Sequence, residues 1–197
     1  MRLLSCALLV CATCAAVVAA DEFKPEAGFK LIFNGKNLDG WQTQAETKKD
    51  KDGNKTEIKS VALEGKTEAY DKRFVVKDGE LVIDYKVKGN RYIETVQQFS
   101  GDFTVRYDFK PEEGCNNDTL LIGTKFDIVT DAKTTTKGVK RGEWNKMEIV
   151  VKSGSADFVI NGEKVATQKL KGEKGPLVLR AEFGPITYKN IRASEAK

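Results

Sequence analysis

Apolar and polar residues alternate with a period of two along several short stretches of this chain. In the stretch 102–110, every second residue is apolar, namely Phe103, Val105, Tyr107 and Phe109. The stretches 145–152 and 177–183 repeat the pattern. Such alternation gives a strand one buried and one wet face, which is typical of antiparallel sheets. After residue 20, no segment has a helical period longer than a turn or two, so the sequence predicts an all-β fold.

Dipeptides suited to tight hairpin turns separate these stretches. They are Asn34-Gly35, Asp39-Gly40, Asp52-Gly53, Asp78-Gly79 and Asn161-Gly162. Many short strands at this spacing indicate a β-sandwich or a barrel. The stretch 43–67 differs, because Lys, Glu, Asp and Thr dominate it, and we expect a long exposed hairpin or insertion there. Since no linker or internal repeat is visible, residues 21–197 are predicted to form a single domain.

The first 20 residues have the layout of a secretory signal peptide. Arg2 supplies a positive charge, the stretch 3–20 carries none, and it ends on Ala20 among small residues. We therefore expect an exported protein, periplasmic or extracellular, with no membrane span after cleavage. Two alternatives stay open. One is a membrane anchor, because about 18 apolar residues is near the lower limit for a span. The other is a lipoprotein signal at Cys11 or Cys14.

The composition argues against several functional classes. Lys and Arg (33) nearly balance Asp and Glu (29) and alternate with them, so nothing indicates a nucleic-acid surface. Cys115 is the one cysteine outside the leader, so no intramolecular disulfide is expected, and the chain has no His to activate its thiol. The acidic segment 50–57 fails the spacing of a calcium loop and indicates a hairpin tip. We expect a monomer that binds no metal and needs no cofactor.

The segment 28–41, GFKLIFNGKNLDGW, resembles the opening motif of the 3-keto-disaccharide hydrolase domain family. Further segments follow in the family's order, at residues 75–82, 99–110, 142–165 and 175–192. The resemblance implies a concanavalin A-like jelly-roll β-sandwich whose concave sheet meets a small saccharide or glycan. It also implies action on glycosides oxidised to a ketone at C3. The ketone acidifies the C2 hydrogen, so a base removes it, the C1 substituent leaves by elimination, and water adds back.

Several polar positions of the family carry other residues in this chain. The family's Asn-Ser-Gly-Ile segment corresponds to residues 117–120, and only Asp127 offers a carboxylate where the family has a Glu-x-Gln strand. In the Leu-Gln-x-His-Gly segment, Arg180 stands for Gln and Glu182 stands for His. We expect Glu182 or Asp127 to act as base or acid, and Arg180 to stabilise the developing enolate.

Four further residues are candidates for binding the saccharide: Arg106, Asp108, Asn117 and Glu148. If their strands lie side by side with those of the catalytic candidates, the charged groups share one solvent face, where clustered carboxylates raise one another's pKa. The alternative is a set of solvated side chains in cross-strand ion pairs. Trp41 and Trp144 could stack on a sugar, but we expect both to pack at the edge of the core.

Three functional classes stay open at this point. The first is an enzyme that cleaves 3-keto-glycosides by elimination and hydration. The second is a binding module of the same fold that holds an extracellular glycan without turnover, and the third is a structural envelope protein. Similarity of fold alone does not distinguish them, because one fold hosts many functions.

Overall fold

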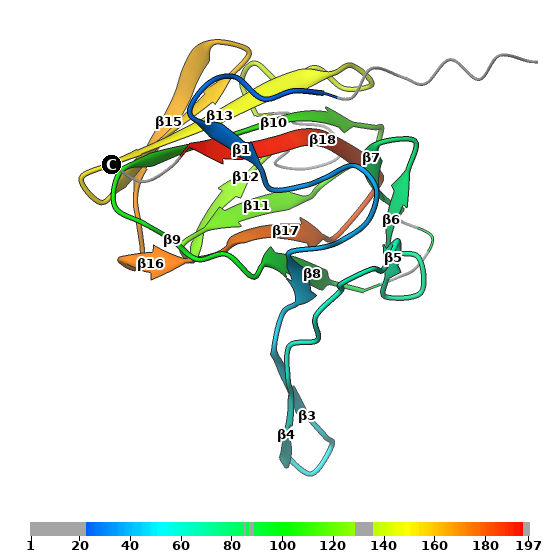
Figure 1. Cartoon of the computed structure of the whole chain (residues 1–197). Coiled ribbons are helices and arrows are strands. Elements are labelled where there is room, and N and C mark those ends of the chain that lie inside the picture. The colour runs from blue at the N-terminus through cyan, green and yellow to red at the C-terminus, as the bar shows by residue number, and fades with distance from the viewer. Residues whose placement is uncertain (1–22, 85, 87–88, 129–135, 195–197) are drawn as a thin grey trace, which may run out of the picture.

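The computed structural model describes residues 23–84, 86, 89–128 and 136–194. The stretch 1–20, interpreted above as a signal peptide, lies outside this part of the chain. The described residues form two main antiparallel sheets and no helix, so the prediction of an all-β sandwich is confirmed (Figure 1). Among these described residues, no helix has the length and the apolar character needed to cross a membrane.

The larger sheet has nine strands in the order β15-β14-β13-β10-β18-β7-β6-β5, with β1 also paired to β18. Its strands, in chain order, are β1 (Phe29–Leu31), β5 (Glu68–Ala69), β6 (Phe74–Lys77), β7 (Glu80–Ile83), β10 (Phe103–Pro111), β13 (Asn145–Lys152), β14 (Ser155–Ile160), β15 (Glu163–Lys169) and β18 (Ile186–Ser194). Sequence neighbours β13, β14 and β15 pair as hairpins, whereas β10 and β18 meet in the middle of the sheet from distant parts of the chain.

The smaller sheet has five strands in the order β12-β11-β17-β8-β2. They are β2 (Trp41–Thr43), β8 (Arg91–Thr95), β11 (Asp118–Leu121), β12 (Thr124–Asp127) and β17 (Leu177–Ala181). Two short ribbons complete the described strands. They are β9 (Phe99–Ser100) with β16 (Lys174–Gly175), and β3 (Glu46–Lys49) with β4 (Lys55–Ile58).

The core lies between the two main sheets. Buried residues occupy every second position of both β10 and β13, as the alternation predicts. Phe126 of the smaller sheet stacks on Phe158 of the larger one, with ring centroids 4.1 Å apart. The hydroxyls of Tyr107 and Thr119 share a hydrogen bond of 2.9 Å across the same interface. Because these inner faces pack together, the outer faces of the two sheets point in opposite directions.

The two tryptophans have different environments. Trp41 is fully buried and its indole N–H donates to the carbonyl of Ile32 at 3.1 Å, which confirms a core position. The same expectation is wrong for Trp144, which is 36% exposed at the surface. The ammonium of Lys189 lies 3.8 Å from the centroid of its ring, so cation–π contact and not core packing holds it. Cys115 is buried, and burial raises the pKa of its thiol to about 11.

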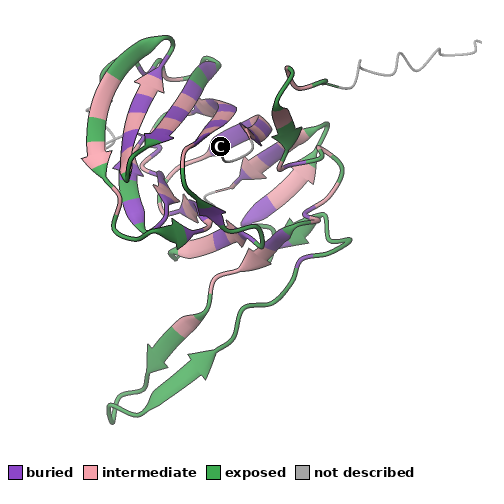
Figure 2. Cartoon of the chain, turned by 60° about the vertical axis from the view of Figure 1, so that its left-hand side comes forward, coloured by how far each residue is buried: buried purple, intermediate pink, exposed green. Residues whose placement is uncertain are grey.

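The ribbon of β3 and β4 projects away from the sandwich (Figures 1 and 2). Every residue of β4 is exposed, and so is most of β3, which confirms the predicted exposed hairpin. At its tip, the Asp50 carboxylate accepts the backbone N–H groups of Asp52 at 2.9 Å and Asn54 at 2.8 Å. Hydrogen bonds from Asn54 also lower the pKa of Asp50. The acidic segment is therefore a self-bonded turn.

Candidate functional site

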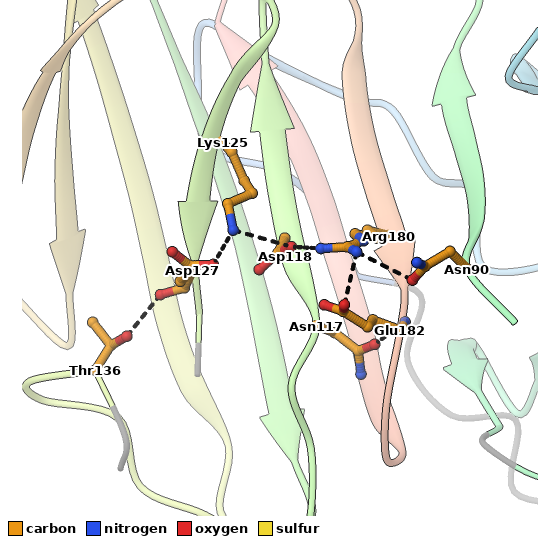
Figure 3. A network of polar contacts seen from close by, with 8 residues as sticks. All are labelled: Asn90, Asn117, Asp118, Lys125, Asp127, Thr136, Arg180 and Glu182. Atoms are coloured by element: carbon orange, nitrogen blue, oxygen red, sulfur yellow. Dashed lines mark hydrogen bonds and ion pairs between the residues drawn. The ribbon is translucent and has the colours of Figure 1, made fainter. Parts of the chain in front are cut away.

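Polar side chains from three adjacent strands meet on the outer surface of the smaller sheet, which we call the five-stranded face. It is defined by Asp118 of β11, Lys125 and Asp127 of β12, Arg180 of β17, and Glu182 just beyond β17. Alternation explains the arrangement, because Leu179 and Ala181 point into the core and leave the residues between and after them outside. Figure 3 shows these side chains linked in one network.

The Arg180 guanidinium joins two carboxylates. Its Nη1 donates to Asp118 Oδ2 at 2.5 Å, and its Nη2 donates to Glu182 Oε1 at 2.7 Å and to Asn90 Oδ1 at 3.2 Å. On the other side of Asp118, the Lys125 ammonium lies 3.7 Å from Asp118 Oδ2 and 2.6 Å from Asp127 Oδ1. Positive and negative groups therefore alternate across the three strands.

Asp118 and Asp127 form a carboxyl pair, because they are directly opposite each other in the pairing of β11 with β12. Asp118 is fully buried, and its Oδ1 has no hydrogen-bond donor among the described residues. Burial, together with hydrogen bonding to Asp127, raises the pKa of Asp118 to about 6. Burial opposes ionisation of Asp127 too, but hydrogen bonds from Asp118 and Lys125 outweigh it and lower the pKa of that carboxyl.

The backbone of Glu182 is held at both of its polar atoms. Its N–H donates to the side-chain carbonyl of Asn117 at 2.6 Å, and its carbonyl accepts from Arg73 Nη2 at 2.8 Å. Arg73 is 1% exposed, and burial lowers the pKa of its guanidinium. Gly184 closes the same turn, since a Cβ there would lie 2.4 Å from the carbonyl oxygen of Gly114. These contacts fix where the Glu182 side chain leaves the sheet.

The three residues expected to be catalytic thus lie in one network, with Glu182 and Asp127 on opposite sides of Arg180. Asn117 is near them but has a different environment. Its amide is fully buried, where it donates to the Gly184 carbonyl at 3.1 Å and to Cys115 Sγ at 3.3 Å. Asn117 therefore shapes the turn that carries Glu182.

The expectation that all candidates share one face is wrong. Arg106, Asp108 and Glu148 lie on β10 and β13 of the larger sheet, and their side chains are on its outer surface, which we call the nine-stranded face. Arg106 pairs there with Glu148 and Glu26, and Asp108 accepts the side-chain N–H of Asn190 at 2.6 Å. The period of two separates inside from outside on each strand, but it does not tell to which sheet a strand belongs.

Sequence reasoning missed Asp118 as a site residue. Its strand, Asp-Thr-Leu-Leu, has a buried residue at three of four positions, so alternation is not visible in it. A usable signal was present nonetheless, because Asp118 occupies the Ser position of the family's Asn-Ser-Gly-Ile segment. Asp118, Asp127, Arg180 and Glu182 are then four substituted family positions that meet on one face. The described residues include no group of three or more His, Cys, Asp or Glu arranged to hold a metal ion.

Comparison with known sequences gives one family. The model described as the 3-keto-alpha-glucoside-1,2-lyase-like domain matches residues 28–137 and 118–194. The chain belongs to this family. A comparison with curated proteins finds no match. The candidate residues of the five-stranded face all fall inside the matched segments of the 3-keto-alpha-glucoside-1,2-lyase-like domain.

Solved structures show the same fold. A protein from Parabacteroides distasonis ATCC 8503, provisionally named a glycosyl hydrolase, is similar with a TM-score of 0.57 and 17% identity, over 86% of this chain and 94% of that one. A beta-1,3-glucanase from Mycobacterium marinum has a TM-score of 0.52 and 13% identity, over 87% and 98%. A Bacillus subtilis protein with a galectin-like fold has a TM-score of 0.50 and 10% identity, over 78% and 88%. The chain therefore shares the β-sandwich fold of these proteins.

Proposed function

We propose that this protein cleaves 3-keto-glycosidic bonds by elimination and hydration at the five-stranded face. The observation that carries the proposal is the carboxyl pair of Asp118 and Asp127, in which Asp118 forms an ion pair with Arg180 and Asp127 forms one with Lys125. Membership of the 3-keto-alpha-glucoside-1,2-lyase-like family supports a substrate with a ketone at C3. The raised pKa of Asp118, about 6, supports proton exchange with its neighbour Asp127, because a group that titrates near the working pH can both take up and release a proton.

In the proposed reaction, the Asp127 carboxylate removes the C2 proton, since this side chain is 42% exposed and open to a substrate. The electron pair of the C2–H bond moves into an enolate, whose oxygen Arg180 stabilises. The enolate re-forms the ketone and makes a C1–C2 double bond as the C1–O bond breaks. Asp127 returns the proton to the departing oxygen. Water then adds across the double bond, with its hydroxyl on C1 and its hydrogen on C2.

The other members of the network support these steps. Asp118 is fully buried and does not reach a substrate, so it acts as a positioning residue that shares its proton with Asp127. Glu182 holds the guanidinium of Arg180 from the opposite side and is the second candidate for the base. Replacing each carboxylate separately distinguishes the two assignments.

The test uses the 4-nitrophenyl glycoside of 3-keto-glucose and follows release of 4-nitrophenol by the purified protein. Asp127→Asn should lower kcat by about 100-fold or more, as is usual for loss of an acid–base group, with less effect on KM. Glu182→Gln should have the smaller effect on kcat if Asp127 is the base. Asp157→Asn is the matched control, because Asp157 lies on β14 of the other sheet. Full activity of both Asp127→Asn and Glu182→Gln would contradict the proposal, and so would a wild-type protein without turnover.

A second candidate function is glycan binding without turnover. It is favoured by the hydrogen bonds of Arg180, whose terminal nitrogens already bind Asp118, Glu182 and Asn90. This function predicts a saccharide that raises the melting temperature in a concentration-dependent way while no 3-keto-glycoside is cleaved.

Export remains a proposal that rests on the first 20 residues. Expression of the full chain in a bacterial host, followed by mass measurement of the protein in the periplasm and medium, tests it. A mature chain beginning at Asp21 supports export, and an uncleaved chain retained in the cytoplasm contradicts it.

A further inference from the structure

The five-stranded face continues beyond Arg180 onto the two remaining strands of its sheet. Tyr92 of β8 is directly opposite Arg180 in the strand pairing, and the centroid of its ring lies 5.7 Å from Arg180 Cζ. Glu94 lies two residues further along β8, so it is on the same face, opposite Gln42 of β2. The acid–base network and these side chains therefore form one continuous polar surface.

Glu94 is a fixed carboxylate without a cation. Its Oε1 accepts from the side-chain amide of Gln42 at 2.9 Å, and its Oε2 accepts from that of Gln44 at 3.2 Å. Among the described residues, no Lys or Arg forms an ion pair with it, whereas Asp118, Asp127 and Glu182 each have one. Two neutral amides hold the carboxylate in place, and they leave its charge available to further donors.

This chemistry matches a sugar ring. A pyranose offers an apolar face of C–H groups, which stacks on an aromatic ring, and an edge of hydroxyls, which donate to a carboxylate and accept from amides. Tyr92 lies on the strand next to that of Arg180, and Gln42 lies on the strand after it. Neighbouring strands are about 4.8 Å apart, so these side chains are within the reach of two linked sugar rings. A second ring, linked to one that reacts beside Arg180, falls over β8 and β2.

We propose that Tyr92, Glu94, Gln42 and Gln44 form a second saccharide subsite, which binds the sugar on the leaving side of the cleaved bond. The inference rests on the proposed function for the direction of the substrate, but the subsite itself depends only on these four residues. These four residues would therefore distinguish a glycoside whose leaving group is a sugar from one whose leaving group is small.

The first experiment compares two substrates, methyl 3-keto-glucoside with one ring and a 3-keto-disaccharide with two. Wild-type kcat/KM should be about tenfold higher for the disaccharide, as expected for one aromatic stacking contact. Tyr92→Ala and Glu94→Gln should remove most of that preference. The matched control is Trp144→Ala, which removes an exposed aromatic ring of the other sheet and should keep the preference. Equal losses for both substrates, or a preference that survives Tyr92→Ala, would overturn the subsite.

A second experiment works without any turnover. The side-chain amide signals of Gln42 and Gln44 are followed by nuclear magnetic resonance while unoxidised disaccharide or monosaccharide is added. The disaccharide should shift these signals at lower concentration than the monosaccharide, and Tyr92→Ala should reduce the shift. If the signals move but no 3-keto-glycoside is cleaved, the proposed reaction fails and the subsite stands. If cleavage occurs and no disaccharide moves the signals, the subsite fails and the reaction stands.

Discussion

Replacing Glu26 by Gln should loosen the segment before β1 from the nine-stranded face. Arg106 and Arg192 are directly opposite each other on β10 and β18, and like charges in that position repel. Glu26 lies between them: its Oε1 is 2.6 Å from Arg106 Nη1, and its Oε2 is 2.8 Å from Arg192 Nε. A neutral amide in place of this carboxylate would offer one acceptor instead of two charged ones, and would leave Glu148 alone to compensate the two guanidinium groups.

The magnitude follows from the ionisation of Glu26. Burial opposes its charge, but hydrogen bonds from Arg192 and Arg106 outweigh burial and lower its pKa from 4.5 to about 2. That difference corresponds to about 3 kcal/mol if all of it is interaction in the folded state. Because the side chain is 37% exposed, water screens the pair, and we expect a loss of about 1–2 kcal/mol. For a chain of this size, the melting temperature should fall by roughly 2–8 °C.

The effect should depend on pH in a defined direction. The folded-state pKa of Glu26 is lowered, so its contribution is complete above pH 4.5 and is lost as the pH falls toward 2. Urea unfolding of the wild type and of Glu26→Gln, measured at pH 7 and near pH 2.5, should show a difference in unfolding free energy that shrinks at the lower pH. High salt should also reduce it, since the pair is partly solvated.

Glu173→Gln is the matched control, because the same chemical change at this exposed position removes no ion pair with another described residue. Its unfolding free energy should stay within about 0.5 kcal/mol of the wild-type value. The reasoning is refuted if Glu26→Gln is as stable as the wild type at pH 7. It is also refuted if the difference is the same size near pH 2.5, because the loss would then come from packing and not from charge.

Three further predictions concern other parts of the chain. Because the pKa of Asp118 is raised, the wild type should gain up to about 3 kcal/mol of unfolding free energy as the pH falls from 7 toward 4, which is the opposite direction to the effect of Glu26. Asp118→Asn should remove this gain, and urea unfolding at several pH values measures it. Arg73→Met leaves the carbonyls of Asp84 and Glu182 without their donor, so urea denaturation should show an unfolding free energy lower by about 2–3 kcal/mol. Arg73→Lys should lower the unfolding free energy by less. Replacing residues 46–58 by Gly-Ser should change the unfolding free energy by less than about 1 kcal/mol in calorimetry, because that hairpin is exposed.

The sequence correctly predicted which side chains of a strand are buried and which are exposed, but it did not predict which strands are neighbours. The alternation in β10 and β13 gave the correct core positions, since each side chain there follows the pleat. It could not show that Arg106 and Arg180 lie on opposite surfaces, because pairing between distant strands depends on the whole topology. The interior residue Thr119 hid the alternation of β11, since its hydroxyl bonds Tyr107 inside the core and looks polar in the sequence.

The pattern of ion pairing differs between the two outer faces. On the nine-stranded face, Glu26 and Glu148 compensate Arg106, and Glu26 also binds Arg192, while Asp108 accepts from the amide of Asn190. On the five-stranded face, Asp118 keeps one oxygen without a donor among the described residues, and Glu94 has only amides as partners. A buried polar atom without a partner costs stability, and such atoms are found preferentially at functional sites. The five-stranded face is therefore the one to test for saccharide chemistry.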